Sequence, residues 1–311
     1  MRSLDSKTVL VTGATGFIGR HLVNRLRQIE NIRLVLLSRK TCITPNPYEI
    51  WVCSSLNQLT PKIWQDNGID QIDVVFHLGA FTPKSASEAN EEEPIFRDNI
   101  YGTRTLLSSF PSFPERFIFA STLDVYSTQL GKAINENDRV YPAGLYGASK
   151  LFCEQLVRIH AGKHGFDSAI LRYGHIFGPG EEAYEKLIPL LIHRLLKGEP
   201  PVLYGDGSAL RDFLYVEDAV EATLRAAFSE KKNIGPVNIV RGQSVSVRDI
   251  AEELIKLIGF TGEIQYLRDR PVGDSLRFDN RRMKELLGEW KIISLAEGLQ
   301  YEVDSFRRLC R

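Results

Sequence analysis

A tyrosine and a lysine lie four residues apart at the start of an expected helix that runs from about Tyr146 to Lys163. Residues at this spacing share one face of a helix. An ammonium group beside a phenol favours the phenolate and lowers its pKa. A phenol tuned in this way can give or take the proton of a carbinol while a hydride moves at the same carbon. Tyr146 is therefore a candidate acid/base residue and Lys150 its tuning residue, although this spacing alone is common by chance.

Two hydroxyl side chains, Ser121 and Thr122, directly follow an expected buried strand at 116–120. Ligands of parallel sheets gather at the carboxyl ends of the strands. A hydroxyl at this edge can hydrogen-bond the reacting oxygen. Capping of the strand is the alternative explanation for both residues.

A third motif is a cluster of glycines, Val11-Thr12-Gly13-Ala14-Thr15-Gly16-Phe17-Ile18-Gly19, between an expected strand and an expected helix. Glycines in such a turn allow a tight bend, let the backbone approach a diphosphate, and let the helix pack closely on the strand. The free N–H groups of the helix N-terminus then attract phosphate. The strand–turn–helix context predicts a dinucleotide site, with contacts from Gly13, Thr15, Gly16, Phe17, Ile18 and Gly19.

The elements that position these motifs alternate between strand and helix. Apolar runs predict strands at 8–11, 32–37, 73–78, 116–120 and 168–172, and helical spacing predicts helices at 17–30, 99–110 and 146–163. This alternation is typical of a doubly wound parallel α/β sheet. After residue 176, Gly and Pro turns break the pattern, and a helix is expected at 247–258. We predict a dinucleotide-binding domain at 1–175, to which 210–235 returns, and a smaller discontinuous lobe formed by 176–209 and 236–311.

The composition indicates the broad class of protein. The 311 residues suffice for a large apolar core, and 39 basic residues balance 39 acidic ones. A net charge of zero argues against nucleic acid or an anionic membrane as the main partner. The four cysteines show no CxxC spacing, which favours reduced thiols and no metal site. The polar start of the chain and the lack of a long apolar stretch predict a cytoplasmic protein.

Taken together, these motifs resemble the extended short-chain dehydrogenase/reductases, and more narrowly their NAD-dependent epimerase/dehydratase group. Further segments carry the resemblance over nearly the whole chain: His77-Leu78-Gly79-Ala80, Asn99-Ile100-Tyr101-Gly102-Thr103, and the stretches 171–180, 211–218 and 270–274. The resemblance implies a Rossmann sheet, a nicotinamide dinucleotide and a nucleotide-sugar substrate.

The resemblance also assigns roles to single residues. It gives Thr122, Tyr146 and Lys150 the catalytic roles. Besides the glycine turn, it implies dinucleotide contacts from Ser38, Arg39, Leu78, Gly79, Ala80, Asn99, Tyr146, Lys150, Tyr173 and His175. It implies substrate contacts from Thr122, Asp124, Tyr146, His175, Arg211 and Arg270. The two arginines would hold the substrate diphosphate by charge-assisted bonds, with surface ion pairing as the alternative.

Two departures from the family pattern concern the substrate. The 4,6-dehydratases of the family usually carry an acidic pair after the threonine, where this chain has Leu123 and Asp124. Dehydration needs an acid to expel a hydroxyl and a base to take a ring proton. Leu123 cannot be that acid and therefore argues against dehydratase activity. Asp124 remains either a base or a packing residue. His175 stands where the family often has asparagine; a neutral pocket histidine is favoured over a proton donor.

Two further departures concern the dinucleotide. The second strand ends in Ser38-Arg39-Lys40 rather than an acidic residue. A hydroxyl and two cations suit the additional phosphate of NADP, although a solvated basic turn is the alternative. The family's aspartate near the adenine is replaced around Ser54 and Ser55. NADP(H) is therefore the preferred cofactor, and NAD(H) remains possible.

The leading functional hypothesis is NADPH-dependent reduction of a 4-keto-6-deoxy nucleotide sugar. The main alternative is a nucleotide-sugar 4-epimerase that reduces NAD transiently, and a remote one is a non-catalytic NAD(P)-binding sensor or scaffold. A homodimer through the helices at 99–110 and 146–163 is also expected. Leu106, Leu107, Leu151 and Leu156 permit such an interface and equally permit core packing.

Overall fold

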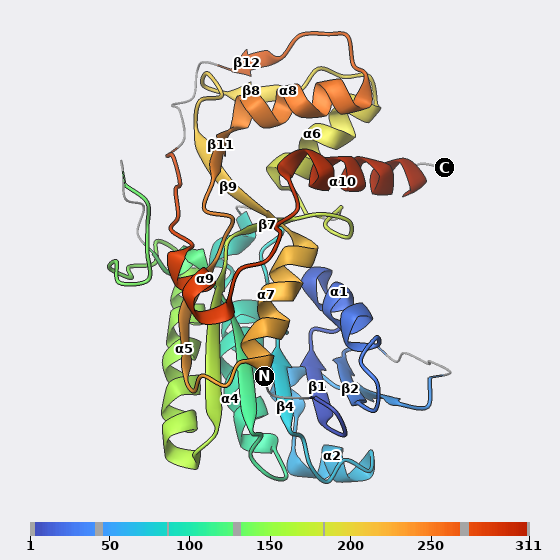
Figure 1. Ribbon diagram of the computed structural model, residues 1–311, viewed down its shortest axis with the longest axis vertical. Coiled ribbons are helices and arrows are strands. Elements are labelled where there is room, and N and C mark those ends of the chain that lie inside the picture. Colours follow the sequence, from blue (N-terminus) through green and yellow to red (C-terminus); the bar gives the residue numbers. More distant parts are fainter. Residues whose placement is uncertain are drawn as a thin grey trace.

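A seven-stranded, wholly parallel sheet forms the centre of the computed structural model (Figure 1). The structure describes residues 4–40, 46–85, 87–126, 132–182, 184–267 and 274–309. The strand order is β10-β6-β5-β4-β1-β2-β3. The bounds are β1 (Thr8–Thr12), β2 (Arg33–Ser38), β3 (Glu49–Cys53), β4 (Val74–His77), β5 (Arg116–Thr122), β6 (Asp167–Tyr173) and β10 (Ile234–Ile239).

Helices cover both faces of this sheet, because its strands are apolar on both sides. Val9 and Val11 of β1 face a core built with α1 (Phe17–Leu26) and α7 (Val216–Phe228). Leu10 faces the opposite core, built with α2 (Pro61–Asp66), α4 (Gly102–Ser109) and α5 (Leu145–His164). Alternation along one strand thus fills two cores.

The helix expected at 99–110 begins earlier than predicted, as the π-helical segment η3 (Ile95–Tyr101), and continues as α4. Leu106 and Leu107 are fully buried in the core, and Leu151 and Leu156 of α5 are half-buried. The two leucines of α4 therefore do not form the exposed interface that the sequence analysis considered. Short segments complete this part of the chain: η1 (Leu56–Gln58), η2 (Ser87–Asn90), α3 (Glu92–Pro94) and η4 (Leu123–Val125).

A second group of elements lies at the carboxyl end of the sheet strands, at the top of Figure 1. It contains a three-stranded sheet, β11-β9-β7, and a strand pair, β12-β8. Their bounds are β7 (His175–Phe177), β8 (Val202–Tyr204), β9 (Leu210–Tyr215), β11 (Ser244–Ser246) and β12 (Gln265–Leu267). The helices are α6 (Leu187–Leu196), α8 (Val247–Ile258) and α10 (Leu295–Leu309), while α9 (Arg281–Leu287) packs against β10.

The doubly wound parallel sheet predicted from the sequence is confirmed. The division into domains stays a prediction, and the boundary placed after residue 235 falls inside β10. Strand β3 was not among the expected strands. In the described part of the chain, no helix is both long and apolar enough to cross a membrane.

Candidate active site

A cleft of about 590 Å³ opens between the carboxyl ends of the sheet strands and the second group of elements. Nearly all of the residues predicted for the site line it. These are Gly13, Thr15, Gly16, Phe17, Ile18, Gly19, Ser38, Arg39, Leu78, Gly79, Ala80, Thr122, Asp124, Tyr146, Lys150, Tyr173, His175 and Arg211. Of the other predicted residues, Asn99 stands behind the wall of the cleft, and Arg270 lies outside the described residues.

The glycine turn at one end of the cleft has the shape of a phosphate cradle. Gly13 has a φ of +69°, and a Cβ there would lie 2.7 Å from the Gly79 nitrogen. A Cβ on Gly19 would lie 2.0 Å from the Gly13 oxygen. The N-cap of α1 is Gly16, and no side chain caps the first N–H groups of the helix. These free donors and the absence of side chains fit the diphosphate of a dinucleotide.

A buried chain of hydrogen bonds fixes this turn against β4. Thr12 Oγ1 accepts from the Gly79 backbone N–H at 2.9 Å and lies 2.7 Å from His77 Nδ1. The second ring nitrogen of His77 lies 2.9 Å from Thr103 Oγ1 on α4. Burial, followed by the charge of Lys150, lowers the pKa of His77 to about 3. A neutral His77 therefore ties the ends of β1 and β4 to α4.

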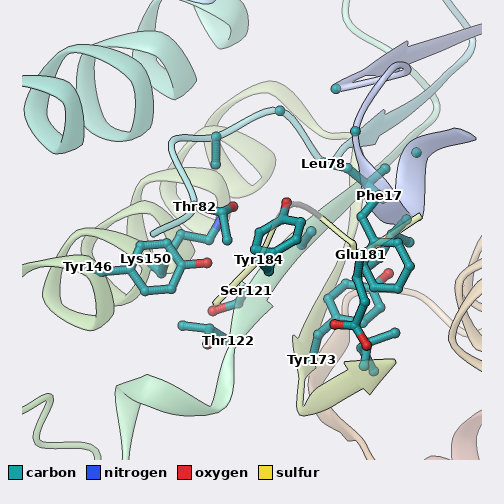
Figure 2. A pocket seen from close by; sticks show the side chains of 18 of the residues that line it. Phe17, Leu78, Thr82, Ser121, Thr122, Tyr146, Lys150, Tyr173, Glu181 and Tyr184 are labelled. Carbon is teal, nitrogen blue, oxygen red and sulfur yellow. The ribbon is translucent and has the colours of Figure 1, made fainter. Parts of the chain in front are cut away.

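Tyr146 and Lys150 lie on the first two turns of α5, beside the end of β5. Figure 2 shows the Tyr146 hydroxyl pointing into the space between Thr82 and Thr122. The Thr82 side chain hydrogen-bonds the phenol. Thr82 was missed by the sequence analysis, because it lies in a loop with no periodic pattern. The structure thus brings a phenol, an ammonium group and two hydroxyls to one point.

The electrostatics of the phenol differ from the expectation. Burial raises the pKa of Tyr146 well above its ordinary value, and the charge of Asp124 raises it further. Burial also lowers the pKa of Lys150 to about 8. The Lys150 ammonium lies 4.6 Å from the centre of the Phe119 ring. In this structure, desolvation therefore outweighs the lowering of the Tyr146 pKa that was predicted from the neighbouring lysine.

Asp124 belongs to the short segment η4 that follows Thr122. Its backbone N–H donates to Thr122 Oγ1 at 3.2 Å, and the Thr122 hydroxyl donates to an Asp124 carboxyl oxygen at 3.2 Å. Burial raises the pKa of Asp124, while Thr122 and the charge of Lys186 oppose this increase. The carboxyl therefore holds Thr122 in place.

Asn99 has a position that the resemblance did not imply. Its side-chain oxygen accepts from the Phe81 backbone N–H at 2.7 Å, and its amide nitrogen donates to Ser149 Oγ at 3.1 Å. Phe81 precedes Thr82, and Ser149 precedes Lys150. Asn99 thus joins the loop that carries Thr82 to the helix that carries Tyr146, and its contact with the dinucleotide stays a prediction.

The end of β2 forms the far side of the glycine turn. Ser38 Oγ accepts from the Lys40 backbone N–H at 3.1 Å. The Arg39 side chain is 77% exposed, and its guanidinium lies 3.8 Å from the Asp98 carboxylate. Ser54, from the segment that replaces the family's adenine aspartate, also lines the cleft. A hydroxyl and an exposed cation are thus available where a dinucleotide ribose would lie.

His175 and Arg211 line the opposite side of the cleft. Burial, followed by the charges of Arg211 and Lys186, lowers the pKa of His175 to about 4. The imidazole is therefore neutral at physiological pH. One Arg211 nitrogen donates to the backbone oxygens of Leu210 at 2.8 Å and Asp274 at 2.5 Å.

Three further wall residues, Glu181, Tyr184 and Lys186, were missed by the sequence analysis. The Lys186 ammonium lies 4.5 Å from the Tyr184 ring centre and 3.7 Å from a Glu181 carboxyl oxygen. All three lie between β7 and α6, outside any periodic pattern. Lys186 is the N-cap residue of α6, and a lysine just before a long apolar run was the signal that could have marked it.

The parallel sheet, the glycine turn, and the helix that carries Tyr146 and Lys150 together define the short-chain dehydrogenase/reductase class. The chain belongs to the NAD dependent epimerase/dehydratase family, whose family model matches residues 9–239. The resemblance inferred from the sequence is therefore confirmed.

Three similar proteins illustrate the family. A trifunctional UDP-glucose 4,6-dehydratase/UDP-4-keto-6-deoxy-D-glucose 3,5-epimerase/UDP-4-keto-L-rhamnose-reductase of Arabidopsis thaliana is 31% identical over 96% of this chain. The chain spans about half of that protein, 47% of its length. A putative UDP-glucose 4-epimerase of Methanocaldococcus jannaschii is 29% identical, over 95% of this chain and 97% of the relative. The crystal structure of UDP-glucuronic acid 4-epimerase from Bacillus cereus with UDP-glucuronic acid and NAD matches with a TM-score of 0.84 and 29% identity, covering 97% of this chain and 99% of that one.

Proposed function

We propose that this chain is a nucleotide-sugar 4-epimerase that works with a bound nicotinamide dinucleotide. The observation that carries the proposal is the meeting of Tyr146, Lys150 and Thr122 at the wall of the same cleft that contains the glycine turn. The Bacillus cereus 4-epimerase supports it, because that fold matches this chain over nearly its whole length and holds a nucleotide sugar and NAD. The 4-ketoreductase hypothesis, which the sequence analysis placed first, takes second place.

In the proposed mechanism, Tyr146 exchanges a proton with the reacting sugar oxygen. Thr122, held by Asp124, orients that oxygen by hydrogen bonding. The bound dinucleotide supplies the hydride acceptor and donor. Because the pKa of Tyr146 is raised, the phenol keeps its proton at neutral pH and is ready to protonate an alkoxide. In the oxidation half-reaction, Tyr146 first gives its proton to solvent, which the ammonium of Lys150 favours, and the phenolate then takes the proton of the sugar hydroxyl.

Dehydration of the sugar does not suit this site, although one relative contains a dehydratase. Expulsion of a hydroxyl needs a proton donor beside the leaving oxygen. The position that carries the donor in dehydratases of the family is Leu123, an apolar residue of which 8% is exposed. The segment after Thr122 thus supplies a single carboxyl, that of Asp124, which does not complete the acid–base pair found there in the dehydratases.

The 4-ketoreductase remains the second candidate because of the residues at the end of β2. Ser38 and the exposed Arg39 suit the additional phosphate of NADP(H), the cofactor of a reductase that consumes reducing equivalents. The structural relative contains NAD, which favours NAD(H) and the epimerase. We propose NAD(H) as the working cofactor of the epimerase and NADP(H) as that of the alternative.

Stoichiometry separates the two candidates. The protein is incubated with UDP-glucose, UDP-glucuronic acid or a 4-keto-6-deoxy nucleotide sugar, each with NAD or NADPH, and the products are resolved by chromatography. An epimerase converts the sugar without net change in the absorbance at ~340 nm, whereas a reductase consumes one NADPH per product. Net oxidation of NADPH in proportion to product would overturn the epimerase proposal.

We also propose a homodimer, through a surface other than the buried leucines of α4. Tyr101 of η3 and Phe152 and Ile159 of α5 are 52%, 53% and 65% exposed. Phe152 and Ile159 lie two turns apart on one face of α5, and η3 packs beside this helix. Large apolar side chains gathered on adjacent helices are typical of an interface.

A further inference from the structure

Two buried carboxyl groups meet behind the wall of the cleft. Glu181 lies in the segment after β7, and Glu302 lies in α10; they are 1% and 0% exposed. The two carboxyls lie close enough for each to act on the pKa of the other. Among the described residues, neither carboxyl oxygen of Glu302 has a hydrogen-bond partner, and Glu181 Oε2 has only the Lys186 ammonium nearby, at 3.7 Å. Two ionised carboxylates would repel each other in this buried contact, so at least one of the two groups keeps its proton.

The pair is connected to the catalytic part of the cleft through Lys186. Glu181 lines the cleft, as Figure 2 shows, and its Oε1 accepts from the Gly178 backbone N–H at 3.3 Å. Its Oε2 lies 3.7 Å from the Lys186 ammonium. The charge of Lys186 acts in turn on Asp124 and His175, which line the catalytic part of the cleft. An ionised Glu181 would therefore neutralise part of the positive charge of Lys186 at the catalytic part of the cleft.

Few other charges act on the pair. Lys186 favours ionisation of both carboxyls, while Glu182 opposes ionisation of Glu302. Three phenols surround the pair: Tyr184 of the same segment, Tyr215 at the end of β9 and Tyr301 of α10. The basic side chains nearby are Arg20 and His21 of α1 and His193 of α6. Of these, His21 is engaged with Glu217 and Pro179, and His193 with the Phe306 ring.

Burial is the largest influence on both carboxyls. It raises the pKa of Glu181 to about 7 and raises the pKa of Glu302 further above its usual range. Ionisation of Glu181 therefore falls within the range of pH in which enzymes work.

We propose that Glu181 and Glu302 are positioning residues whose shared protons set the affinity of the cleft for an anionic sugar nucleotide. When Glu181 is protonated, it is neutral, and Lys186 can meet the ligand's diphosphate. When Glu181 releases its proton to solvent, the new carboxylate pairs with Lys186 and adds negative charge to the wall. This inference rests on the proposed function, because it assumes a negatively charged nucleotide ligand.

The proposal predicts opposite changes in nucleotide affinity for two conservative variants. Glu181→Gln is neutral at every pH, so it should keep the low-pH affinity throughout. Glu302→Gln can donate an amide N–H to the Glu181 carboxylate without any proton being bound. Glu181 should then ionise at lower pH, and affinity should already be weak at pH ~6. If the pair had only a structural role, both variants should lose affinity for the nucleotide to a similar extent, and this loss should not depend on pH. Asp304→Asn, on the exposed side of α10, is the matched control.

The test is titration calorimetry with UDP and dTDP at pH ~6 and ~8, on protein saturated with dinucleotide. For the wild type and Asp304→Asn, Kd should rise about fivefold to tenfold across this interval, the effect of a pKa shift near one unit. Lys150 titrates in every variant, so the comparison between variants isolates the pair. Equal pH dependence in the wild type and Glu181→Gln, or a change of both glutamine variants in one direction, overturns the proposal.

Thermal unfolding without ligand separates this inference from the proposed function. A carboxyl with a raised pKa binds its proton in the folded state and releases it in the unfolded state between pH ~4.5 and ~7. The pair therefore makes the wild type less stable as pH rises through this interval, and Glu181→Gln should flatten that slope. If stability depends on pH in Glu181→Gln as it does in the wild type, the two carboxyls do not hold a proton in the folded state, and the proposal is overturned. A flattened slope without any binding of UDP or dTDP overturns the nucleotide-sugar assignment, and with it the role in affinity.

Discussion

Replacement of Glu154 by glutamine should lower the free energy of unfolding by about 3–5 kcal/mol. Glu154 is fully buried on α5, and its two carboxyl oxygens accept from Arg172 at 2.9 and 2.7 Å. A third hydrogen bond comes from the Ser121 hydroxyl at 2.5 Å. Bonds to a charged group contribute about 1.5–3 kcal/mol each before desolvation is subtracted. Glutamine preserves the shape but leaves the guanidinium of Arg172, which is 4% exposed, without its counter-charge.

Equilibrium unfolding in urea, followed by circular dichroism, measures this loss. The double variant Glu154→Leu/Arg172→Met should be more stable than Glu154→Gln, because it removes both buried charges together. Asp279→Asn is the control, since its partner Arg281 is 87% exposed and the loss should stay below about 1 kcal/mol. If Glu154→Gln loses less than about 1 kcal/mol, or the double variant is no more stable than the single one, an unpaired buried charge is not the cause.

The structure of the site and of its surroundings leads to four further predictions. Tyr146→Phe should lower kcat about 10²- to 10⁴-fold in a sugar-conversion assay while leaving dinucleotide affinity nearly unchanged; full turnover would remove the phenol from the mechanism. Gly19→Ala should abolish dinucleotide binding measured by fluorescence, because its Cβ would lie 2.0 Å from a backbone oxygen. The control Gly162→Ala should bind the dinucleotide normally, because a Cβ at this position of α5 meets open space. Ile159→Asp should shift sedimentation toward the monomer, and a wild type that sediments as a monomer contradicts the proposed dimer. His175→Asn should leave the shape of the pH–rate profile unchanged between pH ~5 and ~8, because the histidine, with its pKa lowered to about 4, is already neutral there.

The parts of the site that could be predicted are carried by short, local patterns. The glycine turn is recognisable because strand, turn and helix N-terminus are contiguous, and the structure gives Gly13 the positive φ that such a turn needs. Tyr146 and Lys150 are recognisable because helical geometry alone places residues four apart on one face. The alternation of strands and helices likewise predicts the parallel sheet, whose pairing needs only the order of the elements along the chain.

The parts that could not be predicted depend on contacts between distant segments. Thr82 reaches the phenol only because Asn99 holds its loop against α5. The raised pKa of Tyr146 depends on how completely the folded chain excludes water, which a local motif does not encode. Leu106 was equally compatible with a core and with an interface, and the structure places it in the core.

Burial opposes ionisation of several carboxyl groups in and behind the cleft, and this bears on what it binds. The carboxyls of Asp124 in the cleft, Glu181 at its wall and Glu302 behind it all have pKa values raised above the usual range by burial. Arg211 and Lys186 remain as cations on the same side. A diphosphate with its negative charges is repelled by ionised carboxylates and attracted by these cations. The burial that raises the carboxyl pKa values therefore favours an anionic ligand over a neutral sugar, and the same carboxyls would penalise that ligand wherever the pH allows them to ionise.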